Sequence, residues 1–156
     1  MEIATFGAGC FWGVEVAFGS VPGVTSTCVG YAGGHLPDPS YRDVCAGETG
    51  HTEVVRVEFD ERRVSYETLL ETFWSCHDPT QVNRQGPDLG YQYRSVVFCE
   101  HDGQIAAAEE SKLRLEESGR HKRPIATAIE RSHSFYLAED YHQKYLAKRG
   151  MATCHV

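Results

Sequence analysis

The residue best suited to chemistry is Cys10, in the segment GCFWGVE at positions 9–15. Phe11, Val14 and Phe18 follow it at helical spacing, so we expect a helix that begins near Cys10. A cysteine at a helix N-terminus faces unpaired backbone N–H groups and the positive end of the helix dipole, and both stabilise a thiolate relative to a thiol. The sequence therefore predicts a reactive thiol at Cys10.

A second candidate is Glu53, in an expected strand over residues 51–60. Counting with a period of two puts Glu53 on the same face as three apolar side chains, those of Val55, Val57 and Phe59. An apolar environment disfavours the charged carboxylate, so a carboxyl group in this place can hold a proton near neutral pH. Glu53 is therefore a candidate general acid.

The expected elements that position these two residues follow the order β-α-β-β-α-β. Strands are expected at residues 3–6, 24–31, 51–60 and 93–99, and helices after Cys10 and after Ser65, the second ending at Asp78 and Pro79. This order is typical of a ferredoxin-like core, a two-layer α+β sandwich with one mixed sheet.

Beyond this core we expect a helix at 102–117, a strand at 125–130 and a final helix at 138–148. The length of 156 residues suits one catalytic domain, 1–156, in which residues 149–156 form an irregular, mobile tail.

Charge and composition exclude several classes of protein. The 22 acidic and 15 basic residues give a net charge of −7, which repels phosphate backbones, so nucleic acid is not an expected partner. The apolar runs are far shorter than the ~20 residues of a membrane span. The N-terminus lacks the pattern of a secretory signal, so we expect a cytoplasmic protein.

The six cysteines contain no CxxC pair, and the histidines form no HExxH motif, so no metal site is expected. Cys28, Cys76 and Cys99 lie in expected strands or core-like segments, where a cysteine packs as a small apolar side chain. Cys45 also lies in such a segment, but it could compete for redox chemistry.

Five stretches, in order, resemble characteristic blocks of the A-class peptide methionine sulfoxide reductases. They are GCFWGVE (9–15), GYAGG (30–34), YRDVCAGETGHTEVV (41–55), RQGPDLGYQYRS (84–95) and FYLAEDYHQKYL (135–146). The resemblance covers nearly the whole chain. It implies reduction of the S epimer of methionine sulfoxide, free or in proteins.

The resemblance also implies roles for the site residues. Cys10 would be the nucleophile and Glu53 the acid that protonates the sulfoxide oxygen. Tyr41 and Tyr93 match the two pocket tyrosines of the family, whose hydroxyls can donate hydrogen bonds to that oxygen. Asp88 matches a further pocket residue that positions the substrate or a water molecule.

Phe11 and Trp12 would enclose the S-methyl group in an apolar recess. The AEDYHQ block, at residues 138–143, is expected to be structural or to support the site.

Turnover requires that a sulfenic acid on Cys10 be resolved, and Cys154, in the expected mobile tail, is the best candidate for that thiol. Family members often carry a second tail cysteine, which this sequence lacks after Cys154, so a direct hand-off to thioredoxin is implied. We expect no metal or organic cofactor, and a monomer.

Two other functions remain open from the residues. One is a cysteine hydrolase or acyltransferase that uses Cys10 with His51 as its base. The other is a non-catalytic thiol redox or metal-binding module.

Overall fold

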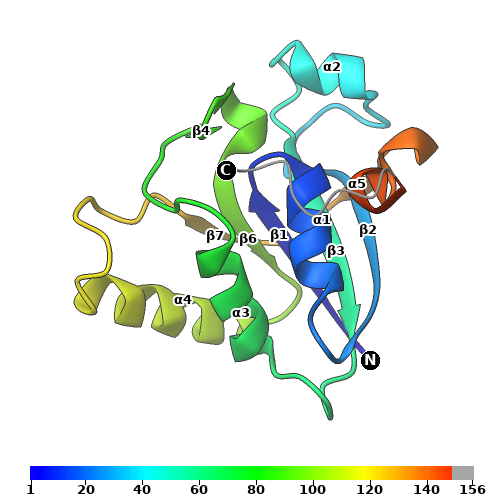
Figure 1. The fold of residues 1–156 in the computed structure, drawn as a ribbon. Helices are drawn as coiled ribbons and strands as arrows, with labels where there is room; N and C mark the ends of the chain where they lie inside the picture. The colour runs from blue at the N-terminus through cyan, green and yellow to red at the C-terminus, as the bar shows by residue number, and fades with distance from the viewer. Residues whose placement is uncertain (149–156) are drawn as a thin grey trace.

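A six-stranded sheet organises the protein (Figure 1), whose structure is a computed structural model that describes residues 1–148. The strand order across the sheet is β7-β6-β1-β3-β2-β8. The strands of the sheet are β1 (Glu2–Ala8), β2 (Val24–Ala32), β3 (Thr52–Phe59), β6 (Ser95–Cys99), β7 (Ala128–Arg131) and β8 (Phe135–Leu137). The helices are α1 (Phe11–Gly19), α2 (Tyr41–Cys45), α3 (Tyr66–Ser75), α4 (Asp102–Glu117) and α5 (Tyr145–Lys148).

The four central strands form the expected split arrangement. The chain crosses from β1 to β2 through α1, and β3 then lies between them, antiparallel to both. Strand β6 pairs antiparallel with the other side of β1, and β7 pairs parallel with β6, which makes the sheet mixed. The predicted α+β class is confirmed.

Helices α1 and α3 lie on one face of the sheet (Figure 1), where aromatic side chains fill the core. The ring of Phe6 on β1 stacks on Phe18 of α1, with centroids 4.6 Å apart, and lies 5.3 Å from the ring of Phe73 on α3. The N-cap of α3 is Ser65, as predicted, because its hydroxyl accepts the backbone N–H of Thr68. This packing holds the start of α1 above the end of β1.

Three expectations for the second half of the chain need correction. The predicted strand at 93–99 begins only at Ser95, because Tyr91–Tyr93 forms a 3₁₀ turn, η1. The predicted strand at 125–130 is β7, which is displaced toward Arg131. The long loop before η1 contains a small hairpin of β4 (Arg84–Gln85) and β5 (Asp88–Leu89).

The predicted helix at 138–148 is wrong. Residues from Phe135 form the edge strand β8, then a 3₁₀ turn, η2 (Asp140–His142), and only then the short α5. The Gln143 side chain bonds the backbone of Val29 on β2, and Lys144 has φ +55, a left-handed conformation that interrupts a helix. Tertiary hydrogen bonds therefore override the helical pattern.

The described residues contain no helix with the length and apolar character that a bilayer crossing requires. The predicted irregular and mobile tail, 149–156, lies outside the described residues, as does Cys154.

Gly30 allows β8 to approach β2, and its replacement tests this packing. A Cβ at Gly30 would lie 2.4 Å from the carbonyl oxygen of Tyr136, so we expect Gly30→Ala to lower the free energy of unfolding by about 1–3 kcal/mol. Gly19→Ala is the matched control, because a Cβ there meets no atom within 4 Å. Urea denaturation measures both, and equal stability of the two variants would contradict this packing.

Candidate active site

Cys10 is the N-cap residue of α1, directly after the turn that ends β1. Gly9 makes this turn with φ +97, which glycine adopts without strain. The Cys10 side chain is partly exposed. The predicted placement at a helix start is confirmed, so the sulfur lies where the N–H groups of the first turn of α1 stabilise negative charge.

Glu53 lies beneath this helix start. It is on β3 opposite Tyr31 of β2, and only 1% of its surface is exposed. Its Oε1 accepts the backbone N–H of Phe11 at 3.3 Å, so its carboxyl group is next to the residue that follows Cys10. Val55, Val57 and Phe59 lie in the same core cluster, as the alternating pattern predicted. The structure thus brings the thiol and a buried carboxyl group together.

Tyr93, the last residue of η1, faces the same site. Burial raises the pKa of its hydroxyl, and negative charge on Glu53, Cys45, Asp88 and Cys10 raises it further. The hydroxyl therefore remains protonated at neutral pH and can donate a hydrogen bond. The charge of Asp88, on β5, acts on the same hydroxyl, so Asp88 lies near Tyr93 together with Glu53 and Cys10.

Tyr41, the first residue of α2, lies near the same groups. Burial raises the pKa of its hydroxyl, and a hydrogen bond with Cys45 and the charges of Glu53 and Tyr93 act in the same direction. The amide Nε2 of Gln92 donates to the Cys45 sulfur at 3.4 Å, which links α2 to the turn that carries Tyr93. Two protonated hydroxyls from separate elements therefore converge on one site.

Phe11 and Trp12 differ in exposure. Phe11 is 1% exposed and packs its ring 5.9 Å from that of Tyr31, whereas Trp12 is half-buried. The Trp12 indole stacks on Tyr145 at 3.8 Å and donates its N–H to Nδ1 of His142 at 3.0 Å. These contacts fix the indole as one apolar wall beside Cys10.

The wall includes residues that were not among the predicted pocket residues. His142 and Tyr145 belong to the FYLAEDYHQKYL block, whose resemblance to the family was the only sequence signal for them. Burial lowers the pKa of His142, although the charge of Glu139 raises it. Its imidazole is thus neutral at neutral pH, as a hydrogen-bond acceptor for Trp12 must be.

His51 is not placed to act as a base. It is 1% exposed, its Nδ1 accepts the backbone N–H of Gly34 at 3.1 Å, and its Nε2 lies 2.7 Å from the carbonyl oxygen of Leu36. Both ring nitrogens are therefore occupied by the backbone of the glycine-rich turn. This geometry argues against a hydrolase that pairs Cys10 with His51.

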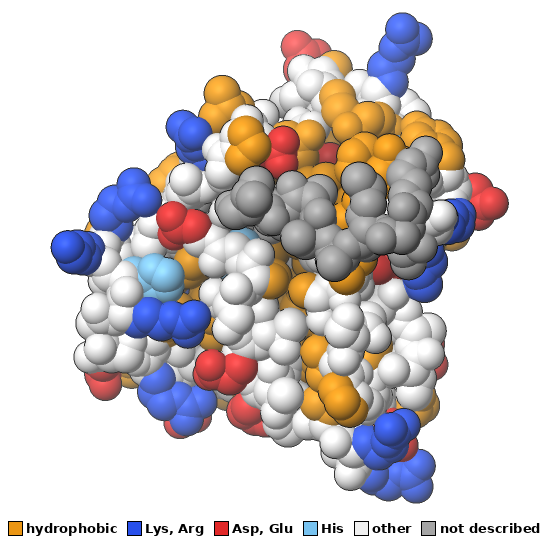
Figure 2. Space-filling model, in the orientation of Figure 1, with side chains coloured by type: hydrophobic (Ala, Val, Ile, Leu, Met, Phe, Trp, Pro, Cys, Tyr) orange, Lys and Arg blue, Asp and Glu red, His pale blue; other side chains and the backbone are white. Residues whose placement is uncertain are grey.

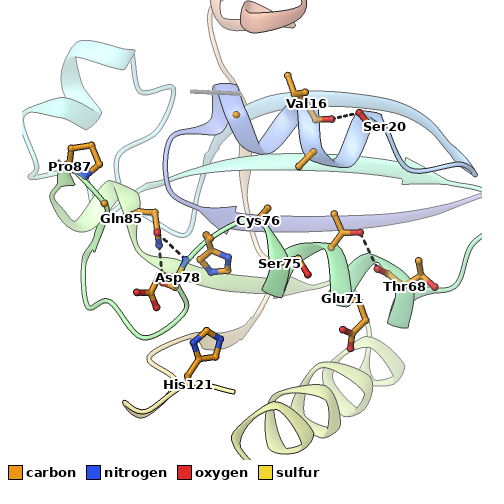
Figure 3. A pocket seen from close by; sticks show the side chains of 15 residues that line it. Val16, Ser20, Thr68, Glu71, Ser75, Cys76, Asp78, Gln85, Pro87 and His121 are labelled. Atoms are coloured by element: carbon orange, nitrogen blue, oxygen red, sulfur yellow. Dashed lines mark hydrogen bonds between the residues drawn. The ribbon is translucent and has the colours of Figure 1, made fainter. Parts of the chain in front are cut away.

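A groove of about 1080 Å³ lies between α1, α3 and the β4–β5 hairpin (Figure 3). Cys10, Glu53, Tyr41 and Tyr93 do not line it. Figure 3 shows side chains of both helices around it, such as Ser20 at the end of α1 and Thr68 of α3, with the Gln85 side chain bound to the backbone of Asp78 at one end. The thiol chemistry therefore lies outside this groove.

Hydrophobic side chains gather on the upper part of the face in Figure 2, near α2 and α5, while Lys and Arg side chains are scattered. Within residues 1–148, no group of three or more His, Cys, Asp or Glu side chains could hold a metal ion.

The pKa values of the other thiols predict which cysteines react. Burial raises the pKa of Cys76 to about 12 and of Cys99 to about 11, and thiolate forms only as the pH approaches those values. Iodoacetamide at pH 8 should therefore modify Cys10 and exposed Cys45 and spare Cys76 and Cys99 in the native protein. Peptide mass spectrometry measures this, and rapid labelling of Cys76 or Cys99 would contradict their burial.

Comparisons with known proteins agree with this geometry. A family profile described as peptide methionine sulfoxide reductase matches residues 2–156. The peptide methionine sulfoxide reductase MsrA of Methanothermobacter thermautotrophicus is 61% identical over 155 residues, which cover 99% of this chain and 92% of that protein. The MsrA of Geobacter sulfurreducens is 55% identical over 154 residues, 99% of this chain and 95% of that protein.

Solved structures give the same result. Mxr1 from Saccharomyces cerevisiae in reduced form superimposes with a TM-score of 0.89 at 36% identity, covering 96% of this chain and 86% of that chain. Methionine sulfoxide reductase A of Corynebacterium diphtheriae has a TM-score of 0.84 at 38% identity, covering 98% and 77%. Mxr1 has also been solved in complex with Trx2.

Proposed function

The chain belongs to the peptide methionine sulfoxide reductase family, and from that premise we propose how its site reduces the S epimer of methionine sulfoxide. The observation that carries the proposal is the hydrogen bond from the Phe11 N–H to the buried carboxyl group of Glu53, beside Cys10. In this contact a buried carboxyl group lies next to the residue that follows Cys10, which supports the roles of acid and nucleophile for the two side chains.

In the first step the Cys10 thiolate attacks the sulfoxide sulfur, and Glu53 delivers a proton to the sulfoxide oxygen. The oxygen passes to Cys10 as a sulfenic acid, and methionine leaves. The substrate sulfur gains two electrons, which the cysteine sulfur loses. Donated hydrogen bonds from Tyr41 and Tyr93 stabilise the negative charge that develops on the oxygen.

Burial supports Glu53 as the acid. Removal from water disfavours its charged form, whereas the N–H of Phe11 favours it. That hydrogen bond, at 3.3 Å, is long for a charged acceptor. A neutral Glu53 also spares Cys10 the repulsion of a second negative charge. We propose that Glu53 holds its proton until the sulfoxide oxygen accepts it.

The recess for the substrate is formed by the indole of Trp12, with Phe11 packed behind it. Stacking on Tyr145 and the hydrogen bond to His142 hold the indole in place, which suits an S-methyl group of fixed size. Asp88, close enough for its charge to act on Tyr93, would position the substrate or a water molecule.

In the second step Cys154 attacks the sulfenic acid sulfur, which releases water and forms a Cys10–Cys154 disulfide. Thioredoxin then reduces this disulfide, and the complex of Mxr1 with Trx2 supports such a partner. Thiols thus supply both electrons, and no metal or organic cofactor takes part. We place this chemistry in one catalytic domain, 1–156, that acts as a monomer in the reducing cytoplasm.

Two cysteine variants test the separate roles of Cys10 and Cys154. Cys10→Ser should release no methionine at all, because it removes the nucleophile. Cys154→Ser should release one methionine per enzyme and then stop, because the sulfenic acid is not resolved. Rapid-quench assays with and without thioredoxin measure both. Normal cycling of Cys154→Ser would overturn the resolving role of Cys154.

A third variant tests the acid. Glu53→Gln keeps the size of the side chain but removes its proton, so the rate of methionine release should fall by roughly 10²–10⁴ fold. Glu58→Gln is the matched control, because Glu58 lies exposed on the same strand, and it should react at the normal rate. Activity retained in Glu53→Gln would remove Glu53 from the mechanism.

A further inference from the structure

Glu139 joins three segments around the site through its carboxylate. Its Oε1 accepts the hydroxyl of Tyr31 on β2 at 2.8 Å, and its Oε2 accepts the backbone N–H of Tyr41 on α2 at 2.9 Å. Burial raises the pKa of Glu139, but these hydrogen bonds outweigh it and lower the pKa below its ordinary value. The group is therefore a charged acceptor at neutral pH, strong enough to hold both donors.

Helix α2 has other contacts, from the Cys45 sulfur to Gln92 and from the Tyr41 ring to His142, but neither of them holds the backbone N–H of Tyr41. Within Tyr41–Cys45, Val44 is the buried residue, whereas Arg42, Asp43 and Cys45 are exposed. The Ser40 hydroxyl accepts the N–H of Asp43, but the N–H of Tyr41 has no acceptor within the helix. Glu139 supplies that acceptor from a segment almost a hundred residues further along the chain.

We infer that Glu139 is a positioning residue for Tyr41: it fixes the start of α2 so that the Tyr41 hydroxyl reaches the sulfoxide oxygen. This inference rests on the proposed function, because it concerns the placement of a proposed oxygen ligand. Glu139 itself does not touch the substrate. Its two oxygens each receive one donor, so Glu139→Gln keeps one acceptor and loses the other, and Glu139→Ala loses both.

A double-mutant cycle on the first step tests this dependence. Tyr41→Phe should slow single-turnover methionine release by about 10- to 100-fold, and Glu139→Ala should slow it by a similar factor. If Glu139 acts through Tyr41, the double variant should be no slower than Tyr41→Phe, within about twofold. Glu139→Ala combined with Tyr93→Phe should instead multiply the two losses. Asp140→Ala, which removes the neighbouring exposed carboxylate, should react normally.

Limited proteolysis gives a readout that does not depend on activity. Trypsin should cleave after exposed Arg42 at least about tenfold faster in Glu139→Ala, because the start of α2 is released. Cleavage after exposed Arg62, in the turn that follows β3, should keep its normal rate and thus show that the rest of the fold is intact. Glu139→Gln should lie between Glu139→Ala and the unaltered protein in both experiments.

The outcomes separate the two proposals. Multiplicative losses for Glu139→Ala and Tyr41→Phe, or unchanged cleavage after Arg42, would overturn the positioning role of Glu139 and leave the proposed function intact. An unaltered protein that releases no methionine would overturn the proposed function. Faster cleavage after Arg42 in Glu139→Ala would still show that Glu139 holds the start of α2.

Discussion

The contact between the Glu53 carboxyl group and the N–H of Phe11 organises the site. One partner is a residue at the start of a buried strand, and the other is in the first turn of the helix that Cys10 begins. The contact exists because the split crossover puts β3 beside β1, so that α1 starts directly above β3. Cys10 gains the favourable field of the helix terminus, and Glu53 loses water. The proposed mechanism requires that Glu53 hold a proton beside the Cys10 thiolate.

The other elements of the site are held around this pair by long-range contacts. The segment from Glu139 to Tyr145 contacts α1 through Trp12, β2 through Tyr31, and α2 through Tyr41. The backbone of this segment forms a turn and a short helix instead of one continuous helix, so its side chains reach three separate elements. A regular helix over these residues would present only one face to the site. The irregular backbone is therefore what allows this one segment to contact three elements beside Cys10.

The sequence alone predicted the local part of this arrangement. Helical spacing after Cys10 and alternation around Glu53 each depend on neighbouring residues, and both patterns were correct. The roles of Tyr41 and Tyr93 needed the family resemblance, since isolated tyrosines carry no directional signal. The contacts of Glu139 and His142 could not be predicted, because they join residues about 100 to 130 positions apart. Another long-range contact of this segment, from Gln143 to the backbone of Val29, accounts for the wrong helix at 138–148.

Protonation of Glu53 is the central claim, and infrared difference spectroscopy measures it directly. Spectra of the unaltered protein and Glu53→Gln at pH 7, without substrate, isolate the carboxyl stretch of this one side chain. We predict a protonated carboxylic acid band that disappears in Glu53→Gln. A carboxylate band in its place would show that Glu53 is charged in the resting enzyme and would contradict its role as the acid.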